Sequence, residues 1–218
     1  MTLDTKDTGS SPISRSPIPP PPPLSLPVWS LATPCRRSSL ANNEISTSMN
    51  IVTFASAVSV AVPKYWMISL YHDTLTKDSF CEAKEGVLQL LTPQQKNLVP
   101  ILGKRSGYEK GFSKSEACQK VGTPWIDRHE LTASSDNQRG KAPQLALLPD
   151  CAAYLHVKLE STVNAGDHLV TICELINTGV WDTKDQTVKQ RSPDAESVSP
   201  MDHHNVLYTG LLRQEGII

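Results

Sequence analysis

The sequence has few aromatic residues, no surplus of charge of either sign and no long apolar run. Aromatic side chains make up 6% of the 218 residues, and 21 Lys and Arg stand against 22 Asp and Glu, for a net charge of −1. This balance provides neither the basic face that neutralises nucleic-acid phosphates nor an acidic tail. No run approaches the ~20 apolar residues of a membrane-spanning helix. We therefore expect a soluble protein that binds neither nucleic acid nor a membrane.

Sequence motifs of several enzyme classes are also missing. The five cysteines are widely spaced, and without a C-x-x-C pair they predict neither a zinc site nor a thioredoxin-type centre. His203 and His204 would point to opposite faces of a strand, which favours a solvated loop over a shared metal. The segment 102–107 (LGKRSG) lacks the Gly that a phosphate-binding loop requires at position 98. No G-x-S-x-G occurs, so a serine hydrolase is disfavoured as well.

Proline is concentrated at the N-terminal end of the chain. Nine of the 17 prolines lie in the first 34 residues, and Pro19–Pro23 form an unbroken run that favours a polyproline II rod. Residues 1–23 contain too little apolar surface to offset the entropy of ordering, so we expect them to be disordered. Their serines are typical of a transit peptide and favour a chloroplast location. The charged Asp4 and Lys6 leave a plain cytosolic tail as the alternative.

Residues 24–218 fit a single domain, whose elements we predict from alternation and turn signals. We expect strands at 26–33, 49–63, 64–71, 86–91 and 206–212, and two more within 151–181 joined through NAGDH. We expect helices near 72–80, with Thr76 as N-cap, at 92–103, with Pro93 in first position, and at 113–120. We expect loops at 38–48 and 182–200. Six or seven short strands without regular strand–helix alternation indicate an antiparallel barrel or sandwich.

The segment from Met49 to Phe80 (MNIVTFASAVSVAVPKYWMISLYHDTLTKDSF) resembles part of the flavin reductase-like, FMN-binding split-barrel family. In that family a strand rich in Ser and Thr runs into a Pro-terminated bend, a hydrophobic strand follows, and a turn with Ser/Thr hydroxyls precedes a helix. NAGDHLVTICEL is similar to the family's Gly-Asp-His turn, LPVWSLAT to its first strand, and VLYTGLLRQEGII to its last strand and tail. The resemblance therefore extends from Leu26 to Ile218.

This resemblance implies a mainly β fold: a six-stranded Greek-key split barrel with a few short helices, assembled as a homodimer with FMN near the subunit interface. Family members typically reduce flavin with NADH or NADPH, so the implied function is an NAD(P)H-dependent flavin reductase. The chain departs from the family at Val62–Pro63, where Pro-Pro is common, and at Phe54, where a small polar residue is common. These departures leave two alternatives, a non-enzymatic flavin- or haem-binding barrel and a purely structural dimerisation domain.

The resemblance also implies residues that contact the flavin ring. Thr53, Ala55 and Ser56 lie on the strand that would approach the ring and ribityl chain, although small residues there are equally compatible with plain barrel packing. His168 would approach the reactive edge of flavin or nicotinamide as the catalytic residue. Asp167 would orient it, and a solvated turn histidine is the alternative.

A second group of residues is implied for the flavin phosphate. Tyr71, Thr74, Thr76 and Lys77 fall where the family's phosphate-contacting turn lies. This turn opens a predicted helix, whose N-terminus favours an anion through its unpaired N–H groups and its dipole. A threonine at such a position is also explained by helix capping alone, since capping requires the same residue type.

Overall fold

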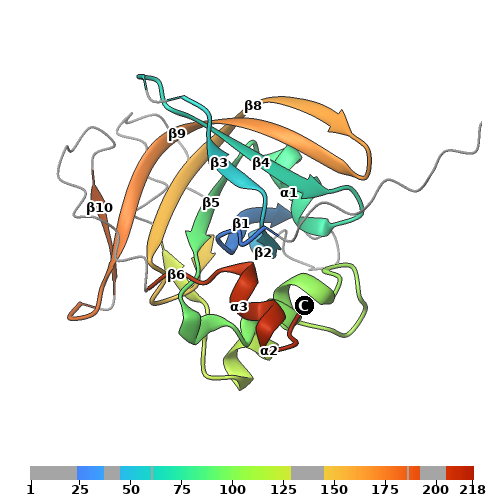
Figure 1. The fold of residues 1–218 in the computed structure, drawn as a ribbon, viewed down its shortest axis with the longest axis vertical. Coiled ribbons are helices and arrows are strands. Elements are labelled where there is room, and N and C mark those ends of the chain that lie inside the picture. Colours follow the sequence, from blue (N-terminus) through green and yellow to red (C-terminus); the bar gives the residue numbers. More distant parts are fainter. Residues whose placement is uncertain (1–23, 37–44, 60, 129–144, 186, 192–204) are drawn as a thin grey trace, which may run out of the picture.

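A computed structural model describes residues 24–36, 45–59, 61–128, 145–185, 187–191 and 205–218 (Figure 1). The predicted disordered leader, residues 1–23, lies outside this range. The fold is built on an antiparallel eight-stranded sheet with the path β2-β1-β5-β8-β9-β4-β3, and β10 pairs with β9. Its strands are β1 (Trp29–Arg36), β2 (Ile45–Val52), β3 (Ala55–Ala57), β4 (Tyr65–Tyr71), β5 (Glu85–Leu90), β8 (Ala153–Ala165), β9 (His168–Asp182) and β10 (Thr187–Arg191). A small separate sheet pairs β6 (Ile126–Arg128) with β7 (Leu145–Leu147).

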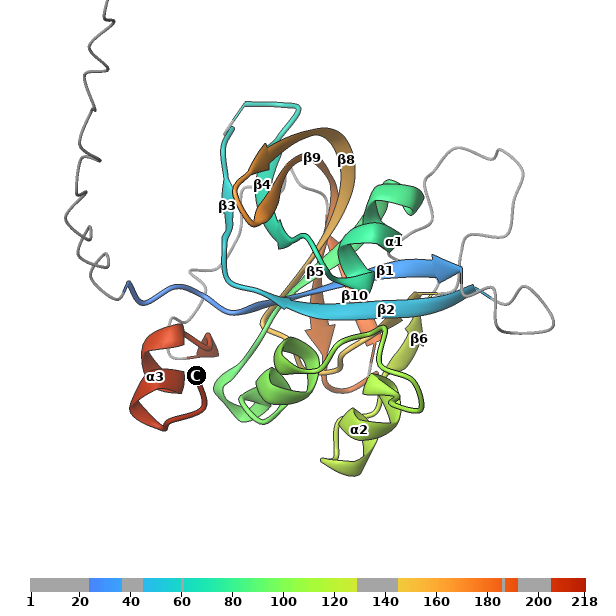
Figure 2. The ribbon, with the colours of Figure 1, turned by 90° about the vertical axis from the view of Figure 1, so that its right-hand side faces the viewer.

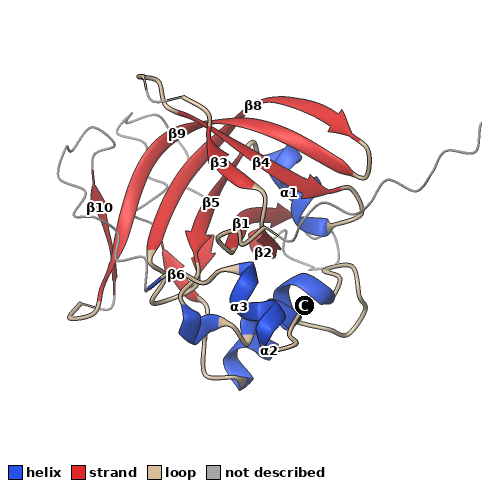
Figure 3. Cartoon of the chain, in the orientation of Figure 1, coloured by secondary structure: helices blue, strands red, loops and turns tan. Residues whose placement is uncertain are grey.

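The helices are short and gather mostly on one side of the sheet (Figure 3). They are α1 (Leu75–Ala83), α2 (Lys114–Lys120), α3 (Thr209–Gln214), the 3₁₀ turn Pro93–Gln95 and the π-helical turn Pro100–Lys104. The helix α1 stands apart from the others and packs on β1, β2 and β5. Among the described residues, no helix is both long and apolar enough to pass through a bilayer.

The two outer strands of the sheet path, β2 and β3, follow each other in the chain. Figure 2 shows β2 running along β1 and then turning upward into β3, which pairs with β4. The chain changes partner at Thr53 and Phe54, where the backbone N–H of Ser69 donates to the carbonyl of Phe54 at 2.9 Å. The barrel is therefore closed by the chain itself but has a split in its hydrogen-bond ladder. The predicted mainly β split barrel is confirmed, with more strands than the six expected.

Both faces of the central strands are buried. On the inner face Leu31, Leu88 and Phe80 belong to one hydrophobic core, inside the curl of the sheet. On the outer face Ala32 and Tyr154 belong to a second core, which the short helices and β7 cover. Every residue of β1 except Arg36 is buried for this reason, which explains why these strands are apolar without clean alternation.

The structure corrects the prediction of one strand over residues 49–63. The strand β2 begins earlier, at Ile45, and ends at Val52, and β3 is a separate strand of three residues. The physical cause is the change of partner, because one straight strand cannot pair with both β1 and β4. Pairing between strands distant in sequence sets this break, and the local alternation does not reveal it.

The prediction of one continuous helix over residues 92–103 is wrong. Pro93 begins a 3₁₀ turn as expected, and Gln95 Oε1 accepts from the N–H of Thr92 at 2.9 Å. The chain then forms a separate π-helical turn that starts at Pro100. The break between the two turns lies at residues 96–97, and residues 98–99 lead helically into the π-helical turn. Pro100 cannot donate the i→i−4 hydrogen bond of a regular α-helix.

The predicted last strand, residues 206–212, is also wrong. The chain is extended only as far as Tyr208, which forms an isolated bridge with Pro27, and α3 then begins. The Thr209 hydroxyl donates to the carbonyl of Leu24 at 3.1 Å and accepts from the N–H of Leu26 at 2.9 Å. These bonds turn the chain across the N-terminal segment instead of along the sheet. The expected loop over 182–200 likewise contains a strand, β10.

Candidate functional site

A small cleft opens where the barrel is split. It has a volume of about 90 Å³ and is lined by Asn50, Ile51, Val52, Thr53, Phe54, Ser69, Leu70, Tyr71, Thr74, Thr76 and His168. Five of the nine residues predicted for the site lie here: Thr53, Tyr71, Thr74, Thr76 and His168. They come from three separate segments, which the change of partner between β2 and β3 brings together.

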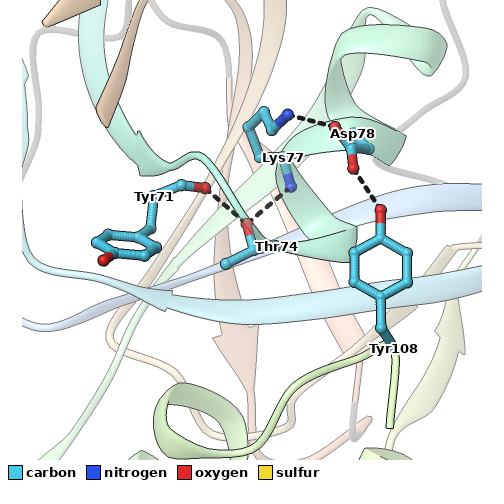
Figure 4. Close-up of polar contacts among 5 residues, drawn as sticks. All are labelled: Tyr71, Thr74, Lys77, Asp78 and Tyr108. Carbon is cyan, nitrogen blue, oxygen red and sulfur yellow. Dashed lines mark hydrogen bonds and ion pairs between the residues drawn. The ribbon is translucent and has the colours of Figure 1, made fainter. Parts of the chain in front are cut away.

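The first turn of α1 forms one wall of the cleft. Thr74 is the N-cap, with extended backbone (φ −123°, ψ 136°), and its hydroxyl accepts from the N–H of Lys77 at 3.3 Å. The same hydroxyl donates to the carbonyl of Tyr71 at 3.0 Å, which ties the helix to the end of β4 (Figure 4). Among the described residues, the N–H groups of Leu75 and Thr76 have no partner. This end of α1 can therefore accept an anion.

The prediction that Thr76 caps the helix is wrong. Thr76 lies inside α1 and is 2% exposed, and its hydroxyl is hydrogen-bonded to that of Ser48 at 2.8 Å. The sequence offers two threonines two residues apart, and only the backbone conformation identifies Thr74 as the cap. The hydroxyl of Thr76 therefore connects α1 to β2.

Lys77 lies beside the cleft without lining it. Its ammonium pairs with Asp78, whose other carboxylate oxygen accepts from the hydroxyl of Tyr108 (Figure 4). Partial burial raises the pKa of Asp78, but the hydrogen bonds from Lys77 and Tyr108 bring this pKa below its usual value. The hydrogen bond to Asp78 raises the pKa of Tyr108 to about 12. Lys77 can reach an anion at the helix end only by leaving this pair.

Three rings surround the mouth of the cleft. Tyr71 lies opposite His168 in the pairing of β4 with β9, and the two rings meet edge to face with centroids 5.2 Å apart. Phe54 meets His168 in the same way at 6.3 Å. Phe54 and Tyr71 are about half exposed, at 53% and 51%. Such exposed rings form an apolar wall against which a planar ligand can stack.

His168 has a fixed partner at the turn between β8 and β9. Its Nδ1 is hydrogen-bonded to Oδ1 of Asp167 at 2.6 Å, and this bond holds the pKa of Asp167 below its usual range. Asp167 is exposed and lies outside the cleft. This hydrogen bond leaves the Nε2 atom of His168 for another partner.

Two other predicted residues, Ala55 and Ser56, lie on β3 outside the cleft. Ala55 packs against the inner core, and the exposed Ser56 hydroxyl donates to the neighbouring carbonyl of Ala57 at 3.3 Å. Asn50 and Phe54 line the cleft although neither was predicted as a site residue. An asparagine within a strand is unfavourable by propensity, and this was a signal for Asn50.

The cleft fits part of a flavin nucleotide and not the whole. The helix end suits a phosphate, and the three rings suit a planar ring system. A volume of about 90 Å³ is well below the about 300–1,000 Å³ of typical small-molecule sites. A flavin nucleotide would therefore extend beyond the cleft over the exposed rings. Among the described residues, no group of three or more His, Cys, Asp or Glu side chains could hold a metal ion.

Comparisons with known proteins agree with this fold. The family described as "Flavin reductase like domain" matches residues 30–202. The FMN-binding protein from Thermus thermophilus has a TM-score of 0.55 at 14% identity, over 84% of this chain and 97% of that one. The NADH:FAD oxidoreductase SgcE6 of Streptomyces globisporus C-1027 gives 0.52 at 12% identity, over 78% and 86%. The styrene monooxygenase flavin reductase of Pseudomonas putida S12 gives 0.50 at 17% identity, over 72% and 82%.

At these identities the likeness to solved structures is one of fold. A comparison with curated proteins finds no match. The match to the family covers most of the strands described above, including the split and the turn before α1.

Proposed function

Because the chain belongs to the flavin reductase-like domain family, we propose that it binds FMN at the split of its barrel and acts as an NAD(P)H-dependent flavin reductase. The observation that carries this proposal is the cleft, where a free helix end and exposed rings meet. A bound flavin supplies a group that accepts a hydride from a nicotinamide nucleotide. The protein then has to bind the flavin and the nicotinamide nucleotide, orient them and shield them from solvent, and no covalent nucleophile is required.

Thr74 and the start of α1 are proposed to hold the flavin phosphate. The N–H groups of Leu75 and Thr76 point outward from the helix end, and the helix dipole favours a negative charge there. The Thr74 hydroxyl fixes this end through its two hydrogen bonds. Thr76 supports this helix end indirectly, because its buried hydroxyl is hydrogen-bonded to that of Ser48. Lys77 is proposed to add a positive charge close by.

Phe54, Tyr71 and Thr53 are proposed to contact the flavin ring, the first two as an apolar wall and the third as a hydrogen-bonding hydroxyl. His168 is proposed to stand at the edge of the ring. Because Asp167 occupies Nδ1, the Nε2 atom of His168 is the one left to bond with a ligand or to move a proton. His168 is 28% exposed at its side chain, so a ligand can reach it.

We propose a homodimer in which the second subunit covers the flavin. The small volume of the cleft leaves most of a flavin outside one chain. Large apolar side chains are exposed just before β3, in the loop after β3, at the end of β4 and at the distal end of β8: Phe54, Val58, Val62, Tyr71 and Val163. Exposed apolar surface of this kind is typical of an interface. Sedimentation equilibrium tests it, and a monomer at micromolar concentration would contradict it.

Three measurements test the proposed function. The purified protein should be yellow or become so with FMN, and FMN at 100 times its Kd should add about 2.7 kcal/mol of stability. For a chain of this size that raises Tm by about 5–10 °C. NADH or NADPH oxidation should accelerate when FMN is added. A protein that binds FMN without oxidising either nucleotide is a non-enzymatic flavin module, and one that gains no stability with FMN contradicts the proposal.

We also propose a chloroplast location, which rests on the composition of residues 1–23 alone. A fluorescent protein fused behind these residues should enter plastids of leaf cells. A fusion that remains in the cytosol would contradict the location and would have no bearing on the proposed flavin site.

A further inference from the structure

A second hollow, an open groove, shares no lining residue with the cleft. It has a volume of about 730 Å³ and lies between the end of β1, the start of α1 and residues 107–113. Its lining includes Arg36, Leu75, Tyr108, Lys110, Phe112 and Glu116. None of the residues predicted for the flavin site lines it, so the proposed function leaves this groove without a role.

Two aromatic rings of the groove are held in place without a ligand. The hydroxyl of Tyr108 donates to the carboxylate of Asp78 in the first turn of α1 (Figure 4), while Tyr108 itself remains 55% exposed. Phe112 has the guanidinium of Arg105 over its ring, 3.9 Å from the centroid. Between the two rings, nothing lies within 4 Å of the position that a Cβ of Gly111 would take. Rings that are fixed beside open space lose little entropy when a partner packs on them.

The polar side chains of the groove suit a segment that accepts hydrogen bonds but donates none. Arg36 and Lys110 are exposed donors, and neither has an ion-pair partner within the described part of the chain. Proline has no backbone N–H, and a polyproline II helix makes no internal hydrogen bonds, so its carbonyls are free to accept. Aromatic-lined grooves bind such segments because the extended helix is already formed before binding. The groove therefore matches a proline-rich segment.

The chain itself contains a segment of this kind. Pro19–Pro23 is an unbroken run, and Arg15 precedes it by four residues. On the groove wall Glu116 is exposed, and among the described residues it has no ion-pair partner. Arg15 and Glu116 are opposite in charge, so the segment complements the groove in charge as well as in its rings and acceptors.

The proline run does not reach the groove of its own chain. Leu24 directly follows the run and lies beside α3, where its carbonyl accepts from Thr209 and Arg213. The groove is at the far end of β1, which spans about 23 Å from Trp29 to Arg36 at roughly 3.3 Å per residue. Figure 2 shows α3 and that end of β1 on opposite sides of the molecule. From Leu24 back to the first proline of the run the chain extends only about 16 Å, at about 3.1 Å per residue.

We propose that the groove binds the proline run of a second copy of this chain. Pro19–Pro23 would pack on the rings of Tyr108 and Phe112, with Arg15 near Glu116. The contact involves no flavin, so its failure and the failure of the proposed function are separate. It exists in the chain that carries its leader, and removal of the leader on import into a plastid would free the groove.

Fluorescence polarisation with a labelled peptide of residues 12–24 tests the contact. The protein is the full chain with Pro20→Ser/Pro21→Ser/Pro22→Ser, so that its own leader does not compete and every described residue is unchanged. We expect the wild-type peptide to bind, and a peptide with the same three serines to bind at least about tenfold more weakly. Adding Tyr108→Ala/Phe112→Ala to the protein should weaken the wild-type peptide by a similar factor.

A charge exchange tests the same contact with substitutions of exposed residues only. Glu116→Arg should weaken the wild-type peptide several-fold and bind a peptide with Arg15→Glu more tightly than the wild-type peptide. Glu82→Arg makes the same change at an exposed glutamate of α1 outside the groove, and as the matched control it should alter neither affinity. A wild-type peptide that fails to bind, or that binds equally after both groove changes, overturns the proposal.

Two further outcomes concern the occupant. A ten-proline peptide that binds as tightly as the leader peptide would overturn the second copy and assign the groove to proline-rich segments of other proteins. A photoreactive residue in place of Ile18 tests the second copy directly. Isotopically heavy chains that carry it are mixed with light chains, allowed to exchange and irradiated. Crosslinks to residues 107–113 should join heavy to light chains, and crosslinks that never do so would overturn the second copy as occupant.

Discussion

The closed side and the split side of the barrel are both built from antiparallel strands, but they differ in strand pairing and in burial. On the closed side β1 pairs with β5 and β5 with β8 without interruption, and both faces of β1 and β5 are buried. On the split side β2 and β3 pair with different strands, aromatic rings are half exposed, and a helix end is free. Stability should therefore depend on the closed side and ligand binding on the split side, and substitutions can separate the two.

The largest effect is expected from Gly86→Ala on the closed side. A Cβ at Gly86 would lie 2.8 Å from the carbonyl oxygen of Ala32 and 3.2 Å from Cδ2 of Phe80. Because the backbone of β1 cannot move away without breaking its ladder, we expect a loss of about 3 kcal/mol in the free energy of unfolding. Urea unfolding measures it. Ser56→Ala, an exposed change on the split side, should stay within about 0.5 kcal/mol.

Tyr154→Phe should cost about 2 kcal/mol and leave the Kd of FMN unchanged. The Tyr154 hydroxyl donates to the carbonyl of Leu148 at 2.7 Å and accepts from the N–H of Cys151 at 3.2 Å, all buried. Burial raises the pKa of this hydroxyl, so it is protonated at every physiological pH. Removing it leaves two buried backbone groups without a partner. Weaker FMN binding in this variant would contradict the division between the two sides.

Thr74→Ala should affect both properties, because Thr74 caps α1 and borders the cleft. Loss of the cap costs about 1 kcal/mol. We also expect the Kd of FMN to rise several-fold, since the helix end would fray where the phosphate is proposed to bind. Thr74→Ser keeps the capping oxygen and should restore both values. A variant that loses stability but keeps the FMN affinity would remove Thr74 from the proposed phosphate site.

The smallest effect is a pH dependence of stability that arises from Lys114. Lys114 is 9% exposed, and its ammonium donates to the carbonyls of Met49 in β2 at 3.1 Å and of Leu102 at 2.5 Å. Burial lowers its pKa to about 8. Above pH 8 the folded chain has released a proton that the unfolded chain still binds, so stability rises with pH until the unfolded lysine also titrates, near 10.5.

We expect this rise to be about 0.7 kcal/mol between pH 7.5 and 8.5. Urea unfolding at several pH values measures it. Lys114→Met should flatten the slope in that window, and Lys110→Met, which changes an exposed lysine of the same region, should keep it. A slope that is equal in the wild-type chain and in Lys114→Met would exclude Lys114 as its source.

Local signals predicted much of the scaffold. Alternation and turn residues located β4, β5 and the β8–β9 hairpin within a few residues, and the helix predicted at 113–120 matches α2, whose N-cap is Ser113. The errors lie where distant contacts override local preference. Residues 206–212 are apolar enough for a strand, but the bonds of Thr209 to the N-terminal segment make them turn into a helix.

The candidate site was predictable only in part. The resemblance selected the segments that contain Thr53, Thr74 and His168, and the structure brings these residues to one cleft. It did not distinguish Thr74 from Thr76, because both are threonines near the same helix start. It also treated Phe54 as a departure from the family pattern, whereas Phe54 forms part of the cleft wall.

By itself the sequence determined the mainly β class, the family and the segments around the split, because periodicity and turn chemistry act between near neighbours in the chain. Tertiary structure alone decided where β2 leaves β1, which threonine caps α1, and that a separate groove lies between α1 and residues 107–113. Those features depend on contacts between residues far apart in the chain, such as Gly107 with Leu75 and Tyr108 with Asp78. No local pattern encodes the distance between such residues.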